Sequence, residues 1–342
     1  MGDHHDFRNQ QVVLKRVPEG VAGPDDFDVR PAPIPEPGPG QLLVEAHYLQ
    51  VEAALRLIIR DSKDFLFRVK PGDLIRNTVA GVVRRSEHPD FKAGDAVLAP
   101  IGVQRLGVVD ASAVQRCDTG LAPLPRWLGG LGITGLTAYF AMFTECRPQP
   151  GQTVVVNGAG GAVGSIAGQL AKLAGARVIG ITGSSEKCRW LVDELGFDAA
   201  INHRKGDLYA QLVEAAPDRI DIIFDNVGGK ILDASLRWIA LHGMVLLCGS
   251  TSQYTQAEMA GPKEYIWLGT MRARMQGFVV FDYADQYDLA RKRLAGWAQS
   301  GAIKFPETII DGDVDAFPAA FQQLYDGVHR GKLLLRLPPA QG

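Results

Sequence analysis

Short, largely apolar runs alternate with longer amphipathic stretches through the middle third of the chain. Strands and helices that alternate with short connections are typical of a parallel sheet covered by helices on both faces. Continuous Val, Ile and Leu runs fit strands that are buried on both sides. We therefore predict an α/β fold with a doubly wound parallel sheet. The predicted strands are 153–157, 177–181, 199–202, 220–224, 244–247 and 278–281, and the predicted helices are 162–174, 186–195, 208–215, 231–240 and 285–300.

The first third of the chain has a different pattern. Residues 31–40 carry proline at every second position, which excludes a helix or a central strand. Short runs at 41–48, 78–84 and 96–98 predict strands. The run 333–337, near the other end of the chain, predicts a strand that rejoins this part. Together these segments predict a second, mostly β domain.

These patterns set the expected domain boundaries. We predict a mostly β domain over 1–128 that is completed by 304–342, and an α/β domain over 129–303. Residues 127–144 carry no charged side chain. Because they contain several glycines, we interpret them as a buried helix and not as a membrane span.

Composition excludes several classes of partner. The chain has 342 residues and a formal net charge of −2, so we expect neither nucleic acid nor a membrane as a partner. Its polar first residues lack the apolar core of a signal peptide, which predicts a cytoplasmic protein. The cysteines are too sparse for a disulfide scaffold and form no C-x-x-C pair, which fits a reducing compartment. They are Cys117, Cys146, Cys188 and Cys248, and the pair His4-His5 has no framework of further metal ligands around it.

A glycine-rich loop follows the strand 153–157. Glycine lets the backbone approach a pyrophosphate, and the following helix offers free N–H groups and the positive end of its dipole. A strand before the loop and a helix after it are the context in which such a motif predicts dinucleotide binding by a Rossmann fold. The alternative is tight packing of helix on sheet without a ligand. The loop reads Asn157-Gly158-Ala159-Gly160-Gly161-Ala162-Val163-Gly164.

The end of the second strand predicts which dinucleotide is bound. Sites that prefer NAD have Asp or Glu there for the ribose hydroxyls. Here Thr182-Gly183-Ser184 follows Ile181 with no acid, and Lys187 comes within one helical turn. A helix N-terminus and a lysine attract a 2′-phosphate. We therefore predict NADP(H), although Lys187 alone is also compatible with a solvated surface lysine.

Several further motifs identify a family. The chain resembles the prostaglandin reductase/leukotriene B4 dehydrogenase branch of the medium-chain dehydrogenase/reductase superfamily, which includes NADPH-dependent alkenal and enone reductases. The resemblance is densest over 130–283. It rests on Gly132-Ile133-Thr134-Gly135-Leu136-Thr137-Ala138-Tyr139-Phe140, on the glycine loop through Ser165, on Glu186-Lys187-Cys188-Arg189, on Phe224-Asp225-Asn226-Val227-Gly228-Gly229, on Cys248-Gly249-Ser250-Thr251-Ser252-Gln253-Tyr254 and on Gln276-Gly277-Phe278-Val279-Val280-Phe281-Asp282-Tyr283.

The resemblance implies a GroES-like catalytic domain in the mostly β part and a set of cofactor contacts in the Rossmann domain. It also implies a homodimer, in which the apolar run 275–281 pairs across a two-fold axis. The implied cofactor residues are Thr137, Gly158, Gly161, Ala162, Val163, Gly164, Ser165, Gly183, Lys187, His203, Asn226, Cys248, Gly249, Ser250, Thr251, Ser252, Tyr254, Phe278, Val279, Val280 and His329.

The chain departs from the family pattern in four places. His203 stands where the family usually has a tyrosine near the 2′-phosphate, and His329 replaces an asparagine. The family's Asp-Pro-Tyr-Met-Arg segment is 52–56 here, and it keeps only Arg56. The family's Trp-x-x-Tyr segment is 103–106 here, with aliphatic and charged side chains. We therefore expect Ala54, Val103 and Leu106 to line a pocket that has lost its aromatic residues.

The sequence predicts hydride chemistry without a metal. The position of the zinc enzymes' Gly-His-Glu motif holds Ala80-Gly81-Val82, so no zinc ligands are expected there. Hydride transfer without a metal needs an acceptor that is already electrophilic, such as a double bond conjugated to a carbonyl. Tyr254 is the candidate catalytic residue, as a hydrogen-bond donor to the ribose or to the enolate. Quinone reduction and a non-catalytic NADPH-binding role remain the alternatives.

Overall fold

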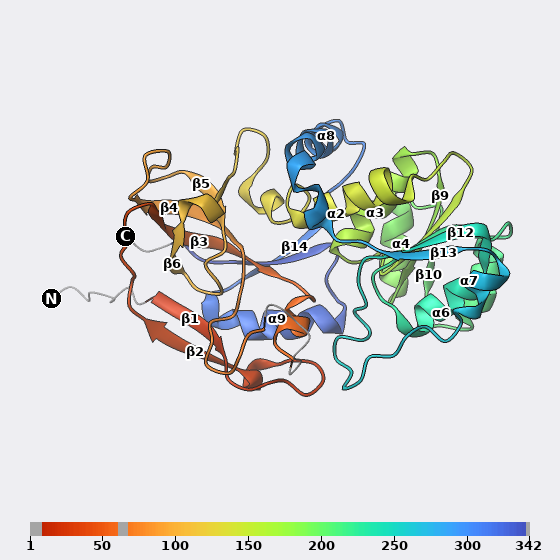
Figure 1. Ribbon diagram of the computed structural model, residues 1–342, viewed down its shortest axis with the longest axis horizontal. Helices are drawn as coiled ribbons and strands as arrows, with labels where there is room; N and C mark the ends of the chain where they lie inside the picture. The colour runs from red at the N-terminus through yellow and green to blue at the C-terminus, as the bar shows by residue number, and fades with distance from the viewer. Residues whose placement is uncertain (1–8, 61–67, 340–342) are drawn as a thin grey trace. The chain divides into compact units, whose positions relative to one another are not determined.

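The computed structural model describes residues 9–60 and 68–339 (Figure 1). The chain divides into two compact units. Unit 1 comprises the described residues up to 128 together with 308–328 and those after 332, and unit 2 comprises 129–307 and 329–332. The division after residue 128 falls where the sequence pattern places it. The return to unit 1 comes at 308 and not at 304, and 329–332 group with unit 2.

Unit 2 is built on a six-stranded parallel sheet with the order β10-β9-β8-β11-β12-β13. The order reverses at β8, as in a Rossmann fold, so right-handed crossovers place α3 and α4 on one face and α5 and α6 on the other. The strands are β8 (Thr153–Asn157), β9 (Arg177–Thr182), β10 (Ala199–Asn202), β11 (Ile220–Asp225), β12 (Ile239–Leu247) and β13 (Arg274–Gly277). The helices are α2 (Ile133–Phe140), α3 (Ala162–Leu173), α4 (Ser185–Asp193), α5 (Leu208–Ala215), α6 (Gly229–Arg237), α7 (Ile266–Thr270) and α8 (Tyr287–Gln299).

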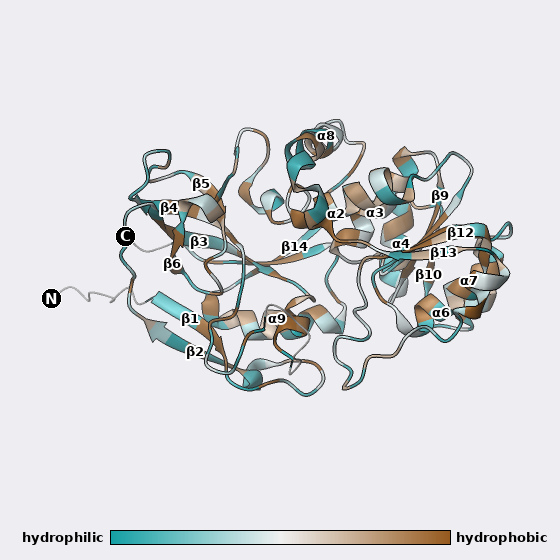
Figure 2. Ribbon diagram, viewed as in Figure 1, coloured by the Kyte–Doolittle hydropathy of each residue, from teal (hydrophilic) through white to brown (hydrophobic). Residues whose placement is uncertain are grey.

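Apolar side chains of the central strands explain why this sheet forms. Val155 of β8, Ile223 of β11 and Val245 of β12 are fully buried, and they pack with Leu212 of α5 and Leu236 of α6 in one cluster. Figure 2 shows hydrophobic residues along these strands. Burial on both faces leaves the strand ends as the places where polar side chains gather.

Several predicted elements of unit 2, including the strand predicted over 244–247, were wrong in extent or type. The helix predicted over 231–240 ends at Arg237, and β12 begins at Ile239. The strand predicted over 278–281 does not form, because strand pairing ends at Gly277 and a 3₁₀ helix begins at Val280. Residues 127–144 are not one helix: α2 continues into a π-helical turn, Ala141–Cys146. The glycines before α2 explain its late start, since a Cβ atom on Gly130 would overlap the ring of Phe305.

Unit 1 is mostly β. A seven-stranded sheet has the order β14-β15-β3-β4-β5-β7, and β6 pairs with β3 beside it, while β1 and β2 form a separate antiparallel pair. The strands are β1 (Asn9–Leu14), β2 (Phe27–Ala32), β3 (Gln41–Val51), β4 (Val79–Ser86), β5 (Ala96–Ala99), β6 (Leu106–Asp110), β7 (Gln115–Arg116), β14 (Glu307–Asp311) and β15 (Lys332–Arg336). The helices are α1 (Leu55–Ile58) and α9 (Phe317–Asp326).

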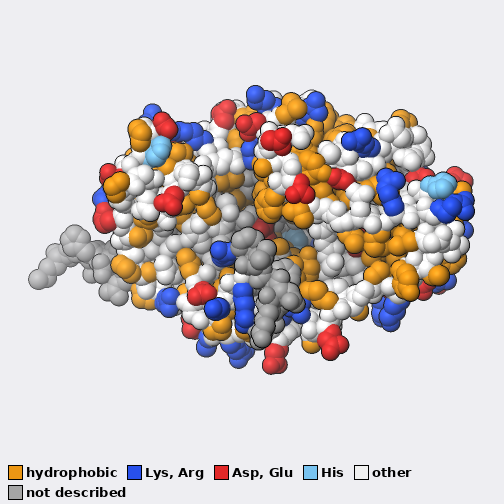
Figure 3. All heavy atoms as spheres, viewed as in Figure 1, with side chains coloured by type: hydrophobic (Ala, Val, Ile, Leu, Met, Phe, Trp, Pro, Cys, Tyr) orange, Lys and Arg blue, Asp and Glu red, His pale blue; other side chains and the backbone are white. Residues whose placement is uncertain are grey.

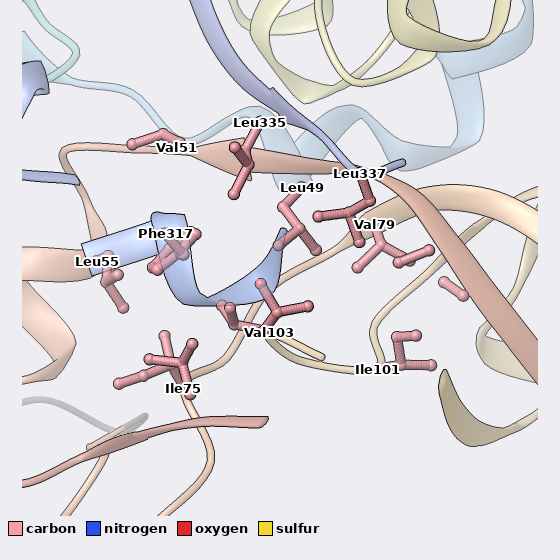
Figure 4. Close-up of a cluster of buried hydrophobic side chains, with 14 of the residues drawn as sticks. Leu49, Val51, Leu55, Ile75, Val79, Ile101, Val103, Phe317, Leu335 and Leu337 are labelled. Carbon is pink, nitrogen blue, oxygen red and sulfur yellow. The ribbon is translucent and has the colours of Figure 1, made fainter. Parts of the chain in front are cut away.

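The core of unit 1 lies between these strands and α9. Leu49 of β3, Val79 of β4, Phe317 of α9 and Leu335 of β15 are buried together in it (Figure 4). Gly81 of β4 allows a close approach to β3, because a Cβ atom there would lie 1.9 Å from the carbonyl oxygen of Glu45. The pairing of β3 with β4 shifts register near this point. The glycine at the position of the zinc enzymes' motif is therefore required by packing.

The surface carries both signs of charge. On the face seen in Figure 3, Lys and Arg are interspersed with Asp and Glu, as the net charge of −2 leads one to expect. Among the described residues, no helix is long and apolar enough to cross a membrane.

Candidate functional site

The glycine loop of unit 2 is closely wrapped around the start of α3. Gly158 has a φ of +74°, a backbone conformation that favours glycine. A Cβ atom on Gly164 would lie 2.5 Å from the carbonyl oxygen of Gly158. The N-cap of α3 is Gly161, which offers no side chain to the first-turn amides of Ala162 to Gly164. Three backbone N–H groups are thus left for an anionic ligand.

Lys187 reaches from α4 back to this loop. Ser184 caps α4 and accepts a hydrogen bond from the amide of Lys187 at 3.1 Å. The lysine side chain then runs along the loop, because a Cβ atom on Gly160 would lie 2.9 Å from Lys187 Cδ and 3.6 Å from its Nζ. Only 8% of Lys187 is exposed. The structure therefore brings Lys187 to the glycine loop.

His329 lies beside Lys187. The amide of Gly331 donates to the carbonyl of Gly160 at 3.0 Å, which holds the segment 329–331 against the loop. Burial and the charge of Lys187 lower the pKa of His329 to about 4, so the imidazole is neutral at pH 7. Its Nδ1 atom is buried and has no hydrogen-bond partner within the described chain. A ligand atom at this place would satisfy that nitrogen.

The electrostatics around Lys187 are unfavourable without an anion. Burial, together with the nearby Arg204 and Arg330, lowers the pKa of the Lys187 ammonium to about 8, while Glu186 opposes them. Glu186 itself is paired with Arg330 at 2.5 Å. A phosphate dianion would offset this local excess of positive charge.

The loop after β12 folds back on the end of β11. Asn226 donates to the carbonyl of Asn157 at 3.0 Å, and its own carbonyl accepts from the amide and the hydroxyl of Thr251, both at 3.1 Å. Ser252 donates through its hydroxyl to the carbonyl of Val227 at 2.6 Å. The structure thus joins Asn226 and the segment 248–254, which the sequence analysis assigns to cofactor binding.

Tyr254 closes that loop. Its hydroxyl oxygen accepts a hydrogen bond from the amide of Ser250 at 3.2 Å and lies 3.2 Å from where a Cβ atom on Gly249 would be. Burial raises the pKa of the Tyr254 phenol, so it is protonated at neutral pH. Because the oxygen accepts from the loop, its O–H hydrogen remains available to donate.

A buried polar network supports this loop from beneath. Asp225 is fully buried and accepts from Asn157 Nδ2 at 2.7 Å and from the amide of Gly228 at 2.9 Å. Desolvation raises the pKa of Asp225 to about 6. Of the motif that contains Asp225, only Asn226 was assigned a role from the sequence. Asp225 could have been found as well, because it is a carboxylate at the end of a buried strand.

The segment 278–280 is held by a residue that the sequence analysis did not single out. Glu145, at the end of the π-helical turn, accepts hydrogen bonds from Gln276 and from the hydroxyl of Tyr283. The ring of Phe278 tilts against Tyr283 with centroids 6.0 Å apart. Val279 is exposed and Val280 is buried. Glu145 therefore fixes both ends of the segment.

Thr137 and Cys248 are two further predicted cofactor residues, and the backbone amide of Cys248 donates to the carbonyl of Asp225 at 2.9 Å. Thr137 is on α2, and its hydroxyl donates within that helix, to the carbonyl of Ile133 at 2.7 Å. Cys248 is half-buried, and desolvation raises the pKa of its thiol to about 12, which makes it a poor nucleophile. Gly183 and His203 lie together at the ends of β9 and β10.

Unit 1 contains a cavity of about 470 Å³ beside the end of β3 and the start of β4. Asn77 connects these ends, since it donates to the carbonyl of Gln50 at 2.8 Å and accepts from its amide at 3.3 Å. The lining is apolar on one part and polar on another. Its apolar residues include Ala54, Leu55, Ile58, Leu74, Ile75 and Ile101, and its polar residues are Gln50, Glu52, Arg76, Asn77 and Thr78.

Two of the three residues that were expected to line the substrate pocket do not line this cavity. Ala54 lines it, but Val103 and Leu106 are buried and do not. Val103 packs in the core of unit 1 (Figure 4) because its backbone bonds to both Val12 and Ile75. Arg56, the one residue retained from the family segment, is also buried, and it donates to the carbonyls of residues 18 and 20 at 2.9 and 2.8 Å.

Within residues 9–60 and 68–339, no group of three or more His, Cys, Asp and Glu side chains is arranged to hold a metal ion. The pair His4-His5 lies outside the described residues. The donor set around the glycine loop instead fits an NADPH molecule. It combines free helix amides, glycines without room for a Cβ atom, a partnerless buried imidazole nitrogen and uncompensated cations.

Comparison with known proteins agrees with this fit. Residues 10–117 match the family model of an N-terminal domain of oxidoreductases, and residues 162–295 match the model described as a zinc-binding dehydrogenase. The chain is 35% identical over 339 residues to the NADPH-dependent curcumin reductase of Escherichia coli, covering 96% of this chain and 97% of that protein. It is 34% identical over 331 residues to a 2-alkenal reductase (NADP⁺-dependent) of Nicotiana tabacum, covering 95% and 96%.

Solved structures show the same architecture. The structure of CurA from Vibrio vulnificus in complex with NADPH superposes with a TM-score of 0.91 at 32% identity, over 96% of this chain and 99% of that chain. The chain therefore belongs to the medium-chain dehydrogenase/reductase family, in the zinc-independent branch that contains the curcumin, alkenal and prostaglandin reductases. The Rossmann and GroES-like fold class expected from the sequence is confirmed.

Proposed function

We propose that this protein uses NADPH to reduce the carbon–carbon double bond of α,β-unsaturated ketones or aldehydes. The observation that carries the proposal is the excess of positive charge beside the glycine loop. Within the described residues Lys187 and Arg204 form no ion pair, Glu186 opposes their charge only in part, and His329 keeps a partnerless nitrogen. Relatives that act on such double bonds support the same chemistry. The proposal requires no metal.

The residues of unit 2 would divide the cofactor between them. The α3 amides beyond Gly161 would bind the pyrophosphate, and Lys187 the 2′-phosphate. Asn226 and the segments 248–254 and 278–280 would hold the ribose and the nicotinamide. When bound, NADPH supplies the hydride for the β-carbon of the substrate.

Tyr254 would stabilise the charge that develops on the substrate. Its protonated hydroxyl accepts a hydrogen bond from the Ser250 amide, and its own O–H hydrogen remains free to donate. A hydrogen bond from it to the enolate oxygen, or to the ribose 2′-hydroxyl, lowers the barrier by stabilising charge that appears only during reaction. Water is the alternative source of the final proton.

The cavity in unit 1 would take the substrate. Its apolar part fits an aliphatic chain, and its polar part contains Gln50, Asn77 and Thr78, which fit a carbonyl or hydroxyl group. Because no aromatic side chain among the described residues lines it, we expect aliphatic enones and enals to be preferred over substrates that depend on ring stacking.

A panel assay tests the proposal. NADPH consumption is measured with enals, enones and quinones, after dialysis against a chelator, and the products are identified. We expect a saturated ketone or aldehyde with its carbonyl intact. An allylic alcohol, or activity that the chelator removes, would contradict the proposed chemistry.

Quinone reduction is a second candidate because the described residues that line the cavity include none of the family's aromatic side chains. Turnover with quinones and none with enones would favour it. NADPH binding without turnover on any member of the panel would instead indicate a non-catalytic role.

A reducing, cytoplasmic location fits the four free cysteines.

A homodimer is also part of the proposal. β13 is the last strand of its sheet, and no described strand pairs with its outer edge. Large apolar side chains lie exposed near it, with Phe281 66% and Ile266 65% exposed. A strand edge with apolar neighbours associates unless it is covered, and pairing across a two-fold axis covers both copies. We expect light scattering to give the mass of a dimer at micromolar concentration, and a monomer there would contradict this expectation.

A further inference from the structure

The residue that follows His203 occupies the place where the second strand of the Rossmann sheet ends. β10 pairs with β9 in parallel, with Asn202 opposite Thr182, so the residues after β10 stand beside Gly183. A Cβ atom on Gly183 would lie 3.2 Å from Arg204 Nε, 3.3 Å from His203 Nε2 and 3.4 Å from Arg204 Cζ. Both side chains therefore lie over the tip of β9, where a 2′-phosphate is recognised in this fold.

Arg204 differs from the other nearby arginine in having no partner. Arg330 is paired with Glu186 and Glu194. Within the described residues, the guanidinium of Arg204 makes no hydrogen bond and no ion pair. Its charge lowers the pKa of both Lys187 and His203, which places it close to these two basic side chains. A cation placed among like charges without an acid is stabilised when an anion binds.

The backbone of Arg204 is fixed before any ligand arrives. Its amide donates to Asn202 Oδ1 at 3.0 Å, and Asn202 Nδ2 donates to the hydroxyl of Ser185 at 3.1 Å. The turn after β10 is thereby tied to the first turn of α4, which also carries Lys187. Such pre-organisation lowers the entropy lost when the ligand binds.

We infer that Arg204 is a specificity-determining residue for the cofactor, and that its guanidinium binds the 2′-phosphate together with Lys187. This inference rests on the proposed use of NADPH. Burial and Arg204 lower the pKa of His203, which leaves it neutral and able to offer one donor only. Arginine offers a planar pair of charged donors that match a phosphate. Arg204 thus takes over the role that the sequence comparison assigns to position 203.

Binding measurements test this without any turnover. The probes are adenosine 2′,5′-bisphosphate, which carries the 2′-phosphate, and adenosine 5′-monophosphate, which does not. We expect Arg204→Gln to weaken the bisphosphate about tenfold or more by calorimetry, and to change the monophosphate less than about twofold. Arg204→Lys should lie between the wild type and Arg204→Gln, because it keeps the charge and loses the paired donors.

Arg189→Gln is the matched control. It removes the same charge from the exposed face of α4, two residues after Lys187, and should change neither affinity more than about twofold. If Arg204→Gln behaves like this control, or weakens both probes equally, the assignment of Arg204 is wrong while the use of NADPH stands. If the wild type itself binds both probes alike, the NADPH preference is wrong as well.

Discussion

Replacing Lys187 with alanine is expected to raise the KM for NADPH about 10- to 100-fold while the KM for NADH changes little. The side chain is nearly buried against the glycine loop, and only NADPH carries the 2′-phosphate that its ammonium would bind. A hydrogen bond to a charged group contributes about 1.5–3 kcal/mol, which corresponds to this range. Steady-state kinetics with both cofactors measure the ratio directly.

Lys292→Ala is the control for that measurement, because Lys292 is an exposed lysine of α8. It should leave both KM values within about twofold of the wild type. An equal rise for NADPH and NADH in Lys187→Ala would show that the lysine supports the loop and does not select the cofactor.

The same side chain predicts a dependence on pH. Because burial, Arg204 and Arg330 lower the pKa of Lys187 to about 8, and Glu186 only partly opposes them, the free protein loses this charge as the pH rises through about 8. The KM for NADPH should therefore be constant below that pH and rise above it. The KM for NADH should not follow this rise, nor should the KM of Lys187→Ala for NADPH.

Tyr254→Phe is expected to lower kcat for enone reduction by about 10- to 100-fold without abolishing it. Loss of a main oxyanion donor costs about 10²–10³-fold, and a role shared with the ribose or with water reduces that cost. The change also removes the acceptor for the Ser250 amide, which contributes about 1 kcal/mol to holding the loop. The thermal midpoint should therefore be measured beside kcat.

Tyr265→Phe removes the hydroxyl of a tyrosine that is 65% exposed, and it should leave kcat unchanged. A fall in kcat for Tyr254→Phe with an unchanged KM for NADPH would support contact with the reacting oxygen. A rise in the KM for NADPH at constant kcat would support a contact with the ribose. An unchanged kcat and KM would remove Tyr254 from the list of functional residues.

The Rossmann part of the fold could be predicted closely from the sequence. The strand 153–157 and the helix 208–215 were predicted with the bounds that the structure has. The strand is an apolar run buried at every position, and the helix begins after Asp207, whose side chain caps its first turn. The strand predicted over 278–281 was wrong, although its residues are also apolar. Its apolar pattern reflects side chains that pack on Tyr283 or lie exposed, and not strand pairing.

The candidate site could be predicted only in part. The glycine loop and Lys187 follow the first and the second strand of the alternating strand–helix pattern, so their places along the chain were sufficient. Arg204 and Glu145 act through neighbours that are distant in sequence, and only the pairing of β10 with β9 and the contact with Gln276 reveal them. Val103 was placed wrongly because a sequence resemblance does not tell which side chains of a loop turn into the core.

The segment 329–332 belongs to unit 2, whereas the stretches on either side of it belong to unit 1. The chain thus passes between the units at four points, and the segment between the third and the fourth of them carries His329 and Gly331 to the glycine loop. A recombination event that replaced everything after residue 307 would exchange strands of unit 1 and, in the same step, the segment of unit 2 that is bonded to the glycine loop. The two units of this chain therefore cannot be exchanged independently at that point.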